Sequence, residues 1–246
     1  MGHKKRVNSV DWHPDGNRVV TAIEDSTTIV WDTRTGQEIL TLKGHDGDVM
    51  SAIYSPDGTM IATAGWDQST KIWDAKTGQQ LLTLNGDKEL PMSAVYRPDG
   101  TRILTVCRAA KIWDATTGRE LVSLTAEIQI LISQSFPCWS PNGDHIAIEV
   151  RSKTTNGNSI DETKVYDGKT GKGLLTLGSV HSATWSPDGK KIVAANWQGQ
   201  PRLFDAQTGH SLIEKAGQHI GPISVVDWSP NGQQFLTASV DRTTKV

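Results

Sequence analysis

Short apolar segments with a two-residue period recur along the whole chain and alternate with polar turns. Five and seven residues after a turn proline stand Val19 and Thr21 in one place, and Ile61 and Thr63 in another. Alternation of this kind predicts a β-strand with one buried face. Further apolar segments, such as residues 38–42, add another strand before the pattern restarts. The pattern predicts an all-β chain of short antiparallel strands.

A turn of the form Ser-Pro-Asp-Gly joins two of these strands in every unit of the pattern. Proline presets φ at the second position, Asp or Asn tolerates the third, and glycine relieves strain at the exit. The turn prolines are Pro14, Pro56, Pro98, Pro141, Pro187 and Pro230, so successive turns lie 42, 42, 43, 46 and 43 residues apart. This period is typical of one four-stranded propeller blade. It predicts a single domain over residues 1–246, with repeats at about 1–43, 44–85, 86–125, 126–178, 179–216 and 217–246.

Two columns of aromatic residues follow the same period. One column lies two residues before each proline and contains Trp12, Tyr54, Tyr96, Trp139, Trp185 and Trp228. The other ends the third strand, usually just before an aspartate, and contains Trp31, Trp73, Trp113, Tyr166 and Phe204. Large aromatic side chains at fixed positions indicate core packing between neighbouring blades.

Length, turn, aromatic columns and the Trp-Asp ending together resemble the WD40-repeat family, and the uniform turns are similar to those of bacterial WD40 arrays. The family also has a Gly-His pair at the head of the repeat, as in Gly44-His45. The resemblance implies that this histidine bonds a Ser or Thr of the second strand, an Asp of the next hairpin and the third-strand Trp. The matching residues are His3, Thr21, Asp25 and Trp31 in repeat one, His45, Thr63, Asp67 and Trp73 in repeat two, and His219, Thr237 and Asp241 in repeat six.

Repeats three to five depart from the family pattern. Asp87 replaces the expected histidine of repeat three, repeat four has extra residues near 154–160, and repeat five is four residues shorter ahead of Pro187. We expect these repeats to lack the full polar network. Repeat six stops one residue before its matching tryptophan. We expect a complete ring to have seven blades, or copies to associate through the strand edge left exposed in repeat six.

Charge and composition narrow the functional classes. The 25 basic and 27 acidic residues give a net charge of -2, which provides no field for nucleic acid or an anionic membrane. No apolar run approaches the roughly 20 residues of a membrane span. Only two cysteines, Cys107 and Cys138, are present, which favours a reducing compartment, and we expect a cytoplasmic location.

The recurring histidine, hydroxyl and carboxylate invite comparison with a hydrolase triad. Three repeats carry this set, whereas catalysis needs it once, and no Gly-x-Ser-x-Gly elbow accompanies it. The seven histidines lack metal-ligand spacing, and the chain has neither a Gly-x-Gly-x-x-Gly nor a Walker loop. We therefore expect no enzyme activity, no metal and no cofactor.

Two tryptophans, Trp66 and Trp197, fall outside both aromatic columns. In the family, the hairpin that holds them opens on the narrow face where partners dock, and Glu24 occupies the matching place in repeat one. A second ring, six residues before each proline, includes Asn8, Met50, Met92 and His181. Tryptophan and methionine on one face suit the anchoring of a peptide or loop. The alternative for both tryptophans is that they cap their hairpins by packing on adjacent blades. For His181 we favour a polar surface residue over a pH switch.

These observations predict a non-catalytic scaffold or sensor module for protein partners in signalling. A propeller of hydrolase or lactonase type would need metal-binding carboxylates around the channel. A nucleic-acid-binding propeller would need a basic face.

Overall fold

The computed structural model describes residues 2–85, 93–107, 109–124, 129–130, 137–153, 156, 159–213 and 217–246. These residues form strands and turns, with no helix among them, and the strands form six antiparallel sheets. The predicted fold class, an all-β propeller made of antiparallel blades, is confirmed. Contacts group the chain into two compact units, Met1–Ser123 and Leu124–Val246. The single-domain boundary stays a prediction.

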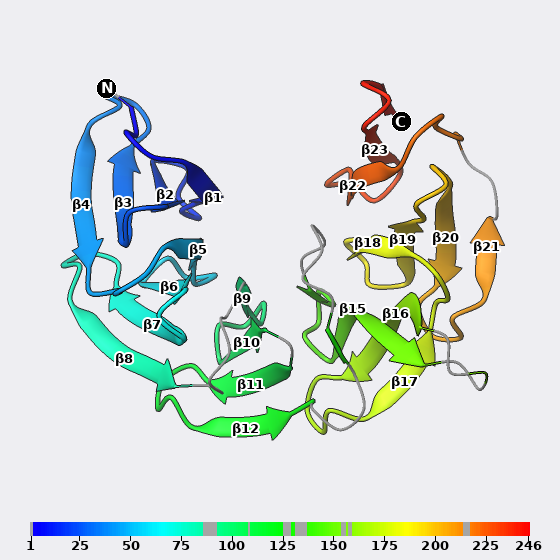
Figure 1. Ribbon diagram of the computed structural model, residues 1–246, viewed down its shortest axis with the longest axis horizontal. Coiled ribbons are helices and arrows are strands. Elements are labelled where there is room, and N and C mark those ends of the chain that lie inside the picture. Colours follow the sequence, from blue (N-terminus) through cyan, green and yellow to red (C-terminus); the bar gives the residue numbers. More distant parts are fainter. Residues whose placement is uncertain are drawn as a thin grey trace. The chain divides into compact units, whose positions relative to one another are not determined.

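The first compact unit holds three four-stranded sheets, each with its strands side by side in chain order (Figure 1). The first strands of successive sheets contact one another, β1 with β5 and β5 with β9, and the fourth strands form the opposite edges. The strands are β1 (Val7–Trp12), β2 (Arg18–Ile23), β3 (Thr27–Asp32), β4 (Glu38–Lys43), β5 (Val49–Tyr54), β6 (Met60–Gly65), β7 (Ser69–Asp74), β8 (Gln80–Asn85), β9 (Ser93–Tyr96), β10 (Arg102–Val106), β11 (Ala110–Asp114) and β12 (Glu120–Ser123).

The second compact unit holds the other three sheets. In the fourth sheet β13 and β14 both pair with β15, and the described part of the sixth sheet has three strands. The strands are β13 (Gln129–Ile130), β14 (Cys138–Trp139), β15 (His145–Lys153), β16 (Ser159–Asp167), β17 (Gly173–Thr176), β18 (His181–Trp185), β19 (Lys191–Ala195), β20 (Pro201–Asp205), β21 (Ser211–Ile213), β22 (Ile223–Trp228), β23 (Phe235–Ser239) and β24 (Thr244–Lys245). The extra residues of repeat four lengthen β15 and β16, which stay paired as far as Lys153 and Ser159.

The Ser-Pro-Asp-Gly turns have the geometry that their residues predict. In the second sheet, the N–H of Gly58 donates to the carbonyl of Ser55 at 2.8 Å, which closes the turn. Gly58 has a φ of 73°, a left-handed conformation that glycine adopts at little cost. The Asp57 carboxylate accepts the Ser55 hydroxyl and the Thr59 N–H. Each turn therefore fixes where the second strand begins.

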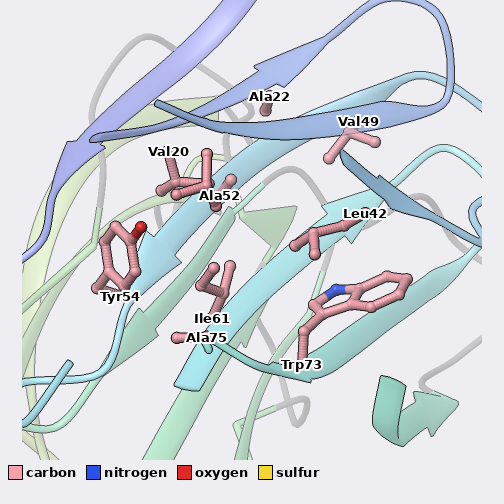
Figure 2. Close-up of a cluster of buried hydrophobic side chains, with 10 residues drawn as sticks. Val20, Ala22, Leu42, Val49, Ala52, Tyr54, Ile61, Trp73 and Ala75 are labelled. Carbon is pink, nitrogen blue, oxygen red and sulfur yellow. The ribbon is translucent and has the colours of Figure 1, made fainter. Parts of the chain in front are cut away.

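The second strand of the first sheet, β2, is buried on both faces, so the prediction of one buried face was wrong for this strand. Val20 and Ala22, which lie on the face of β2 opposite to Val19 and Thr21, have exposed fractions of 0%. They pack on residues of the next sheet, and Figure 2 shows Val20 beside Ala52 and Leu42 beside Trp73. Sheets that stack face to face bury both sides of an inner strand. The hydrophobic core of the first compact unit therefore lies between its sheets.

A β-bulge in the first strand of the sheet sets which side chains point inward. In the second sheet the pairing shifts between Val49 and Ser51, which places Val49 and Ala52 on the same buried face. The first and sixth sheets shift at the matching residues. In the shortened fifth repeat the shift lies between His181 and Thr184, with Ser182 at a φ of 48°. His181 therefore takes an inward position in β18.

Candidate functional site

A chain of buried polar groups crosses the second sheet. The indole N–H of Trp73 donates to the Thr63 hydroxyl oxygen at 2.8 Å, and that hydroxyl lies 2.7 Å from His45 Nε2. The other imidazole nitrogen, Nδ1, lies 2.9 Å from the carboxylate of Asp67. Since a carboxylate accepts, Nδ1 carries the proton and Nε2 accepts from Thr63. Every polar group of these four side chains therefore has a hydrogen-bond partner.

The carboxylate of Asp67 also connects the loop before β5 to the hairpin between β6 and β7. It accepts the backbone N–H of Asp46 at 3.1 Å and the Ser69 hydroxyl at 2.8 Å. Burial lowers the pKa of His45 below its ordinary value of 6.5, which favours the neutral imidazole. A neutral histidine saturated by buried hydrogen bonds serves as a connector between strands.

The sixth sheet holds the same arrangement. His219 Nε2 lies 2.8 Å from the Thr237 hydroxyl, and Nδ1 lies 3.0 Å from the carboxylate of Asp241. That carboxylate accepts the N–H of Ile220 and the hydroxyl of Thr243. The structure therefore brings together the three residues that the resemblance implied for this repeat.

The first sheet brings together only part of its implied set. The Trp31 indole N–H donates to Thr21 at 2.9 Å, but within the described part of this sheet His3 meets only the edge of Trp31, with ring centroids 4.9 Å apart. Asp25 accepts from Thr27 in its own turn. In the first sheet the buried side chain of Ile23 occupies the position that Gly65 occupies in the second sheet. A Cβ atom on Gly65 would lie 2.4 Å from His45 Nδ1. The second and sixth sheets, with Gly65 and Ser239 at this position, hold their histidine inward, whereas the first sheet has the larger, branched Ile23 there.

Repeat three keeps the Trp-to-hydroxyl bond, with Trp113 donating to Thr105 at 2.8 Å. Its Asp87 lies outside the described residues.

No group of three or more metal-ligating side chains occurs within the described ranges. The polar chains have no substrate-facing nucleophile, because His45, Thr63, His219 and Thr237 are all buried.

Trp66 lies in the hairpin between β6 and β7, beside the loop that precedes β5. Its backbone N–H donates to the carbonyl of Asp48 at 2.9 Å, and a Cβ atom on Gly47 would lie 2.9 Å from the Trp66 carbonyl carbon. The loop therefore packs closely on the backbone of the hairpin. The side chain of Trp66 remains 45% exposed. A fixed backbone and an exposed indole suit contact with a partner.

Trp197 has the corresponding place in the fifth sheet, and its ring is 51% exposed. One face of the indole stacks on the imidazole of His181, with ring centroids 4.1 Å apart. His181 Nε2 donates to the carbonyl of Ile223 at 2.7 Å. This bond links the fifth sheet to the sixth, and it holds the support beneath Trp197 in place.

His181 is 4% exposed, so its interpretation as a polar surface residue was wrong. The shifted bulge of the short fifth repeat turns its side chain inward. In this position it supports Trp197 and has little surface to offer to a partner. The sequence contained a signal, the four-residue shortening ahead of Pro187, but its effect depends on where the bulge forms.

The other residues predicted to contact a partner are half-buried or lie outside the described ranges. Asn8 Nδ2 donates to the carbonyl of Val49 at 2.9 Å and approaches Met50 Sδ at 3.6 Å, so it joins the first sheet to the second. Glu24 pairs with Arg6 at 3.5 Å. Met92 lies outside the described residues. Of the predicted set, Trp66 and Trp197 therefore present the most exposed side chains in the described structure.

Hydrogen bonds between sheets involve residues that the sequence reasoning missed. The Asp11 carboxylate accepts the backbone N–H of Tyr54 at 2.8 Å, and the Ser9 hydroxyl oxygen accepts that of Ala52 at 2.9 Å. Ser182 accepts the N–H of Val226 in the same way. In the sequence these residues could be recognised as polar residues three or five positions before the turn proline.

Comparison with protein families agrees with this architecture. The model "WD domain, G-beta repeat" matches residues 1–32 and 36–74, and the model "Anaphase-promoting complex subunit 4 WD40 domain" matches residues 137–231. The chain belongs to the WD40-repeat family. The WD40 matches lie in both compact units and include Trp66 and Trp197.

Similar proteins carry WD-repeat or RNA-export names. WD repeat-containing protein 1 of Gallus gallus is 36% identical over 128 residues, which cover 44% of this chain and 21% of the relative. The protein of that name in Mus musculus is 37% identical over the same length and the same shares. Poly(A)+ RNA export protein of Schizosaccharomyces pombe is 32% identical over 69 residues, covering 28% of this chain and 20% of the relative. The chain thus matches about one fifth of the length of these relatives.

The described residues contain no helix that is both long and apolar enough to cross a membrane.

Proposed function

We propose that this WD40 chain is a non-catalytic module that binds protein or peptide partners through the hairpins of Trp66 and Trp197. The proposal rests mainly on one observation. Each indole is about half exposed, 45% and 51%, although its surroundings are held by hydrogen bonds and close packing. An exposed aromatic ring on a rigid support loses little conformational entropy on binding.

The two anchors lie in different compact units, and each is proposed to act on its own. Asp46, next to the Trp66 hairpin, is exposed, whereas Gln198 and Gln200 flank the Trp197 hairpin. The Trp66 region therefore favours a partner segment with basic residues beside an apolar one. The Trp197 region favours a neutral, hydrogen-bonding segment.

Capture of partners from a lysate of the native source tests the proposal. Trp66→Ala and Trp197→Ala should each reduce the recovery of bound proteins by at least about tenfold, since the loss of an anchoring tryptophan costs about 2 kcal/mol. Leu81→Ala and Leu212→Ala are matched controls, because these side chains are 46% and 50% exposed on the outer strands β8 and β21. Recovery that is unchanged in the double tryptophan variant would contradict the proposal.

An RNA-related partner is a second candidate. It is suggested by the name of the Schizosaccharomyces pombe relative and by the mRNA export factor of Xenopus tropicalis, which is 36% identical over 72 residues. The net charge of -2 speaks against direct binding to the phosphate backbone. A gel-shift titration with single-stranded RNA at low salt should show no complex, whereas a salt-sensitive shift would favour this candidate.

Signalling and a cytoplasmic location are part of the proposal. The location rests on the small number of cysteines, Cys107 and Cys138. Fluorescence microscopy of a tagged chain would test it.

A further inference from the structure

The loop before β22, residues 217–222, presents an aliphatic side chain to solvent. The side chain of Ile220 is 99% exposed, more than any other large apolar side chain in the described part of the chain. Its backbone is nevertheless fixed, because the Ile220 N–H donates to the Asp241 carboxylate at 3.0 Å. On the next residue, a Cβ atom on Gly221 would lie 3.0 Å from Val240 Cγ2. The loop therefore packs closely on the hairpin of its own sheet and leaves Ile220 outside.

The same loop also packs on the Trp197 hairpin of the fifth sheet. The backbone N–H of His219 donates to the carbonyl of Gly199 at 2.8 Å. A Cβ atom on Gly199 would lie 2.6 Å from the carbonyl oxygens of both His219 and Gly221. Gly199 has a φ of 77°, so glycine is required there by conformation as well as by space. The hairpin of one sheet and the loop of the next are therefore fixed to one another.

The Trp197 hairpin depends on this contact because it lacks the carboxylate of the second sheet. Asp67 follows Trp66 and bonds His45, whereas Gln198 follows Trp197. The fifth-sheet hairpin is closed by Asn196 instead, whose Oδ1 accepts the backbone N–H groups of the second and fourth residues after it. The sixth-sheet loop supplies the remaining support.

This packing joins two exposed apolar side chains into one patch. Trp197 is 51% exposed and lies two residues before Gly199, and Ile220 lies one residue after His219. An extended partner segment advances about 3.3 Å per residue, so roughly three or four residues reach from one side chain to the other. The patch therefore has the size of a short peptide contact.

The surroundings of the patch are free of acidic and basic residues. Residues 196–200 and 217–222 contain no Asp, Glu, Lys or Arg, whereas residues 44–48, beside Trp66, contain two aspartates. The Asp241 carboxylate and the Lys245 ammonium group, which contact the sixth-sheet loop, already bond its backbone. A charged partner group would lose hydration here without gaining an opposite charge from either segment.

We propose that Trp197 and Ile220 together bind a large apolar side chain of a partner peptide, such as leucine, methionine or phenylalanine, flanked by uncharged residues. Contact with both side chains removes the apolar group from water on two sides. Gln198 and Gln218 are exposed, and their amides can bond the peptide backbone. This inference rests on the proposed function of Trp197, and it names the partner chemistry of that site.

Selection of random linear peptides displayed on phage, with the wild-type chain as bait, tests the proposal. Peptides that bind the wild type but not Trp197→Ala should share a large apolar residue between uncharged ones. Their affinity, measured by fluorescence polarisation of the synthetic peptides, should fall at least about tenfold in Ile220→Asp. Leu212→Asp is the matched control, 50% exposed on β21, and should bind like the wild type.

A selection on the Ile220→Asp chain adds a change of specificity, which a merely structural effect would not produce. It should enrich peptides with a basic residue beside the apolar one, because the new carboxylate attracts a cation. Circular dichroism establishes that each variant is folded, and Ile220→Ala replaces Ile220→Asp if that variant is not.

Two results would overturn the inference alone and leave Trp197 as a partner anchor. One is a set of Trp197-dependent peptides that bind the folded Ile220 variant as tightly as the wild type. The other is a set whose shared feature is a charged residue. If the wild type selects no peptide that depends on Trp197, the inference and the proposed role of Trp197 both fail.

Discussion

Thr63 connects the buried polar chain of the second sheet, because its hydroxyl accepts from Trp73 and donates to His45. Thr63→Val keeps the shape of the side chain and leaves both partners buried without this bond. Since one buried unsatisfied group costs about 1–3 kcal/mol, the free energy of unfolding should fall by roughly 3 kcal/mol. Urea denaturation followed by tryptophan fluorescence measures this change.

Thr21→Val is the matched control for this prediction. Thr21 accepts from Trp31, while His3 lies at the edge of Trp31 instead of bonding the hydroxyl. The Trp31 indole, which is not fully buried, loses its acceptor, and the carbonyl of Ile29 loses a hydroxyl donor at 3.3 Å, so the loss should be about 1 kcal/mol. Equal losses in the two variants would contradict the account of a connected chain in the second sheet.

At the scale of the elements, the turn after each third strand depends on an ionised aspartate. The Asp74 carboxylate accepts the backbone N–H of Thr77 at 2.7 Å and its hydroxyl at 2.8 Å. These bonds lower the pKa of Asp74 below its ordinary value of 3.8. Asp32, Asp114, Asp167 and Asp205 make the same contacts. The aspartate that ends the third strand therefore has a structural role that recurs in five sheets.

The lowered pKa of Asp74 predicts a pH dependence. A carboxyl group with a lower pKa in the folded state stabilises the protein above its unfolded pKa of about 3.8, and this contribution is lost as the pH falls through the folded pKa. Asp74→Asn should lower Tm at neutral pH, and its difference from the wild type should shrink as the pH falls below about 3.8. Calorimetry over this pH range checks the prediction, and a constant difference in Tm would contradict it.

Strand number, turn positions and aromatic columns could be predicted from the sequence, because proline, glycine and alternation act locally. The burial of individual side chains was harder to predict from the sequence, since it depends on which sheet packs against which face of a strand. Trp12 and Tyr54 have the same offset from their prolines, yet one is 61% exposed and the other 5%. Likewise, His181 is buried because the register shift in β18 lies between His181 and Thr184, closer to the turn proline than the shift between Val49 and Ser51 in β5, and the alternation of apolar residues does not specify this position.

At the scale of the whole molecule, one sheet design is repeated, and its exceptions carry the candidate functions. Trp66 and Trp197 are exposed on hairpins with fixed surroundings, and Ile220 is exposed on the loop that packs on the Trp197 hairpin. The polar chains in the second and sixth sheets are buried and saturated, which assigns them to stability. The repeats thus separate residues that hold the sheets together from residues that are available to partners.

Photo-cross-linking tests the central claim most directly. A photoreactive phenylalanine derivative replaces Trp66 or Trp197 in otherwise wild-type chains, and Leu81 or Leu212 in matched controls of similar exposure. In extracts of the native source, positions 66 and 197 should give discrete cross-linked protein partners, and positions 81 and 212 should give none of them. Cross-links of the same proteins in equal yield at all four positions, or at the control positions only, would contradict the account.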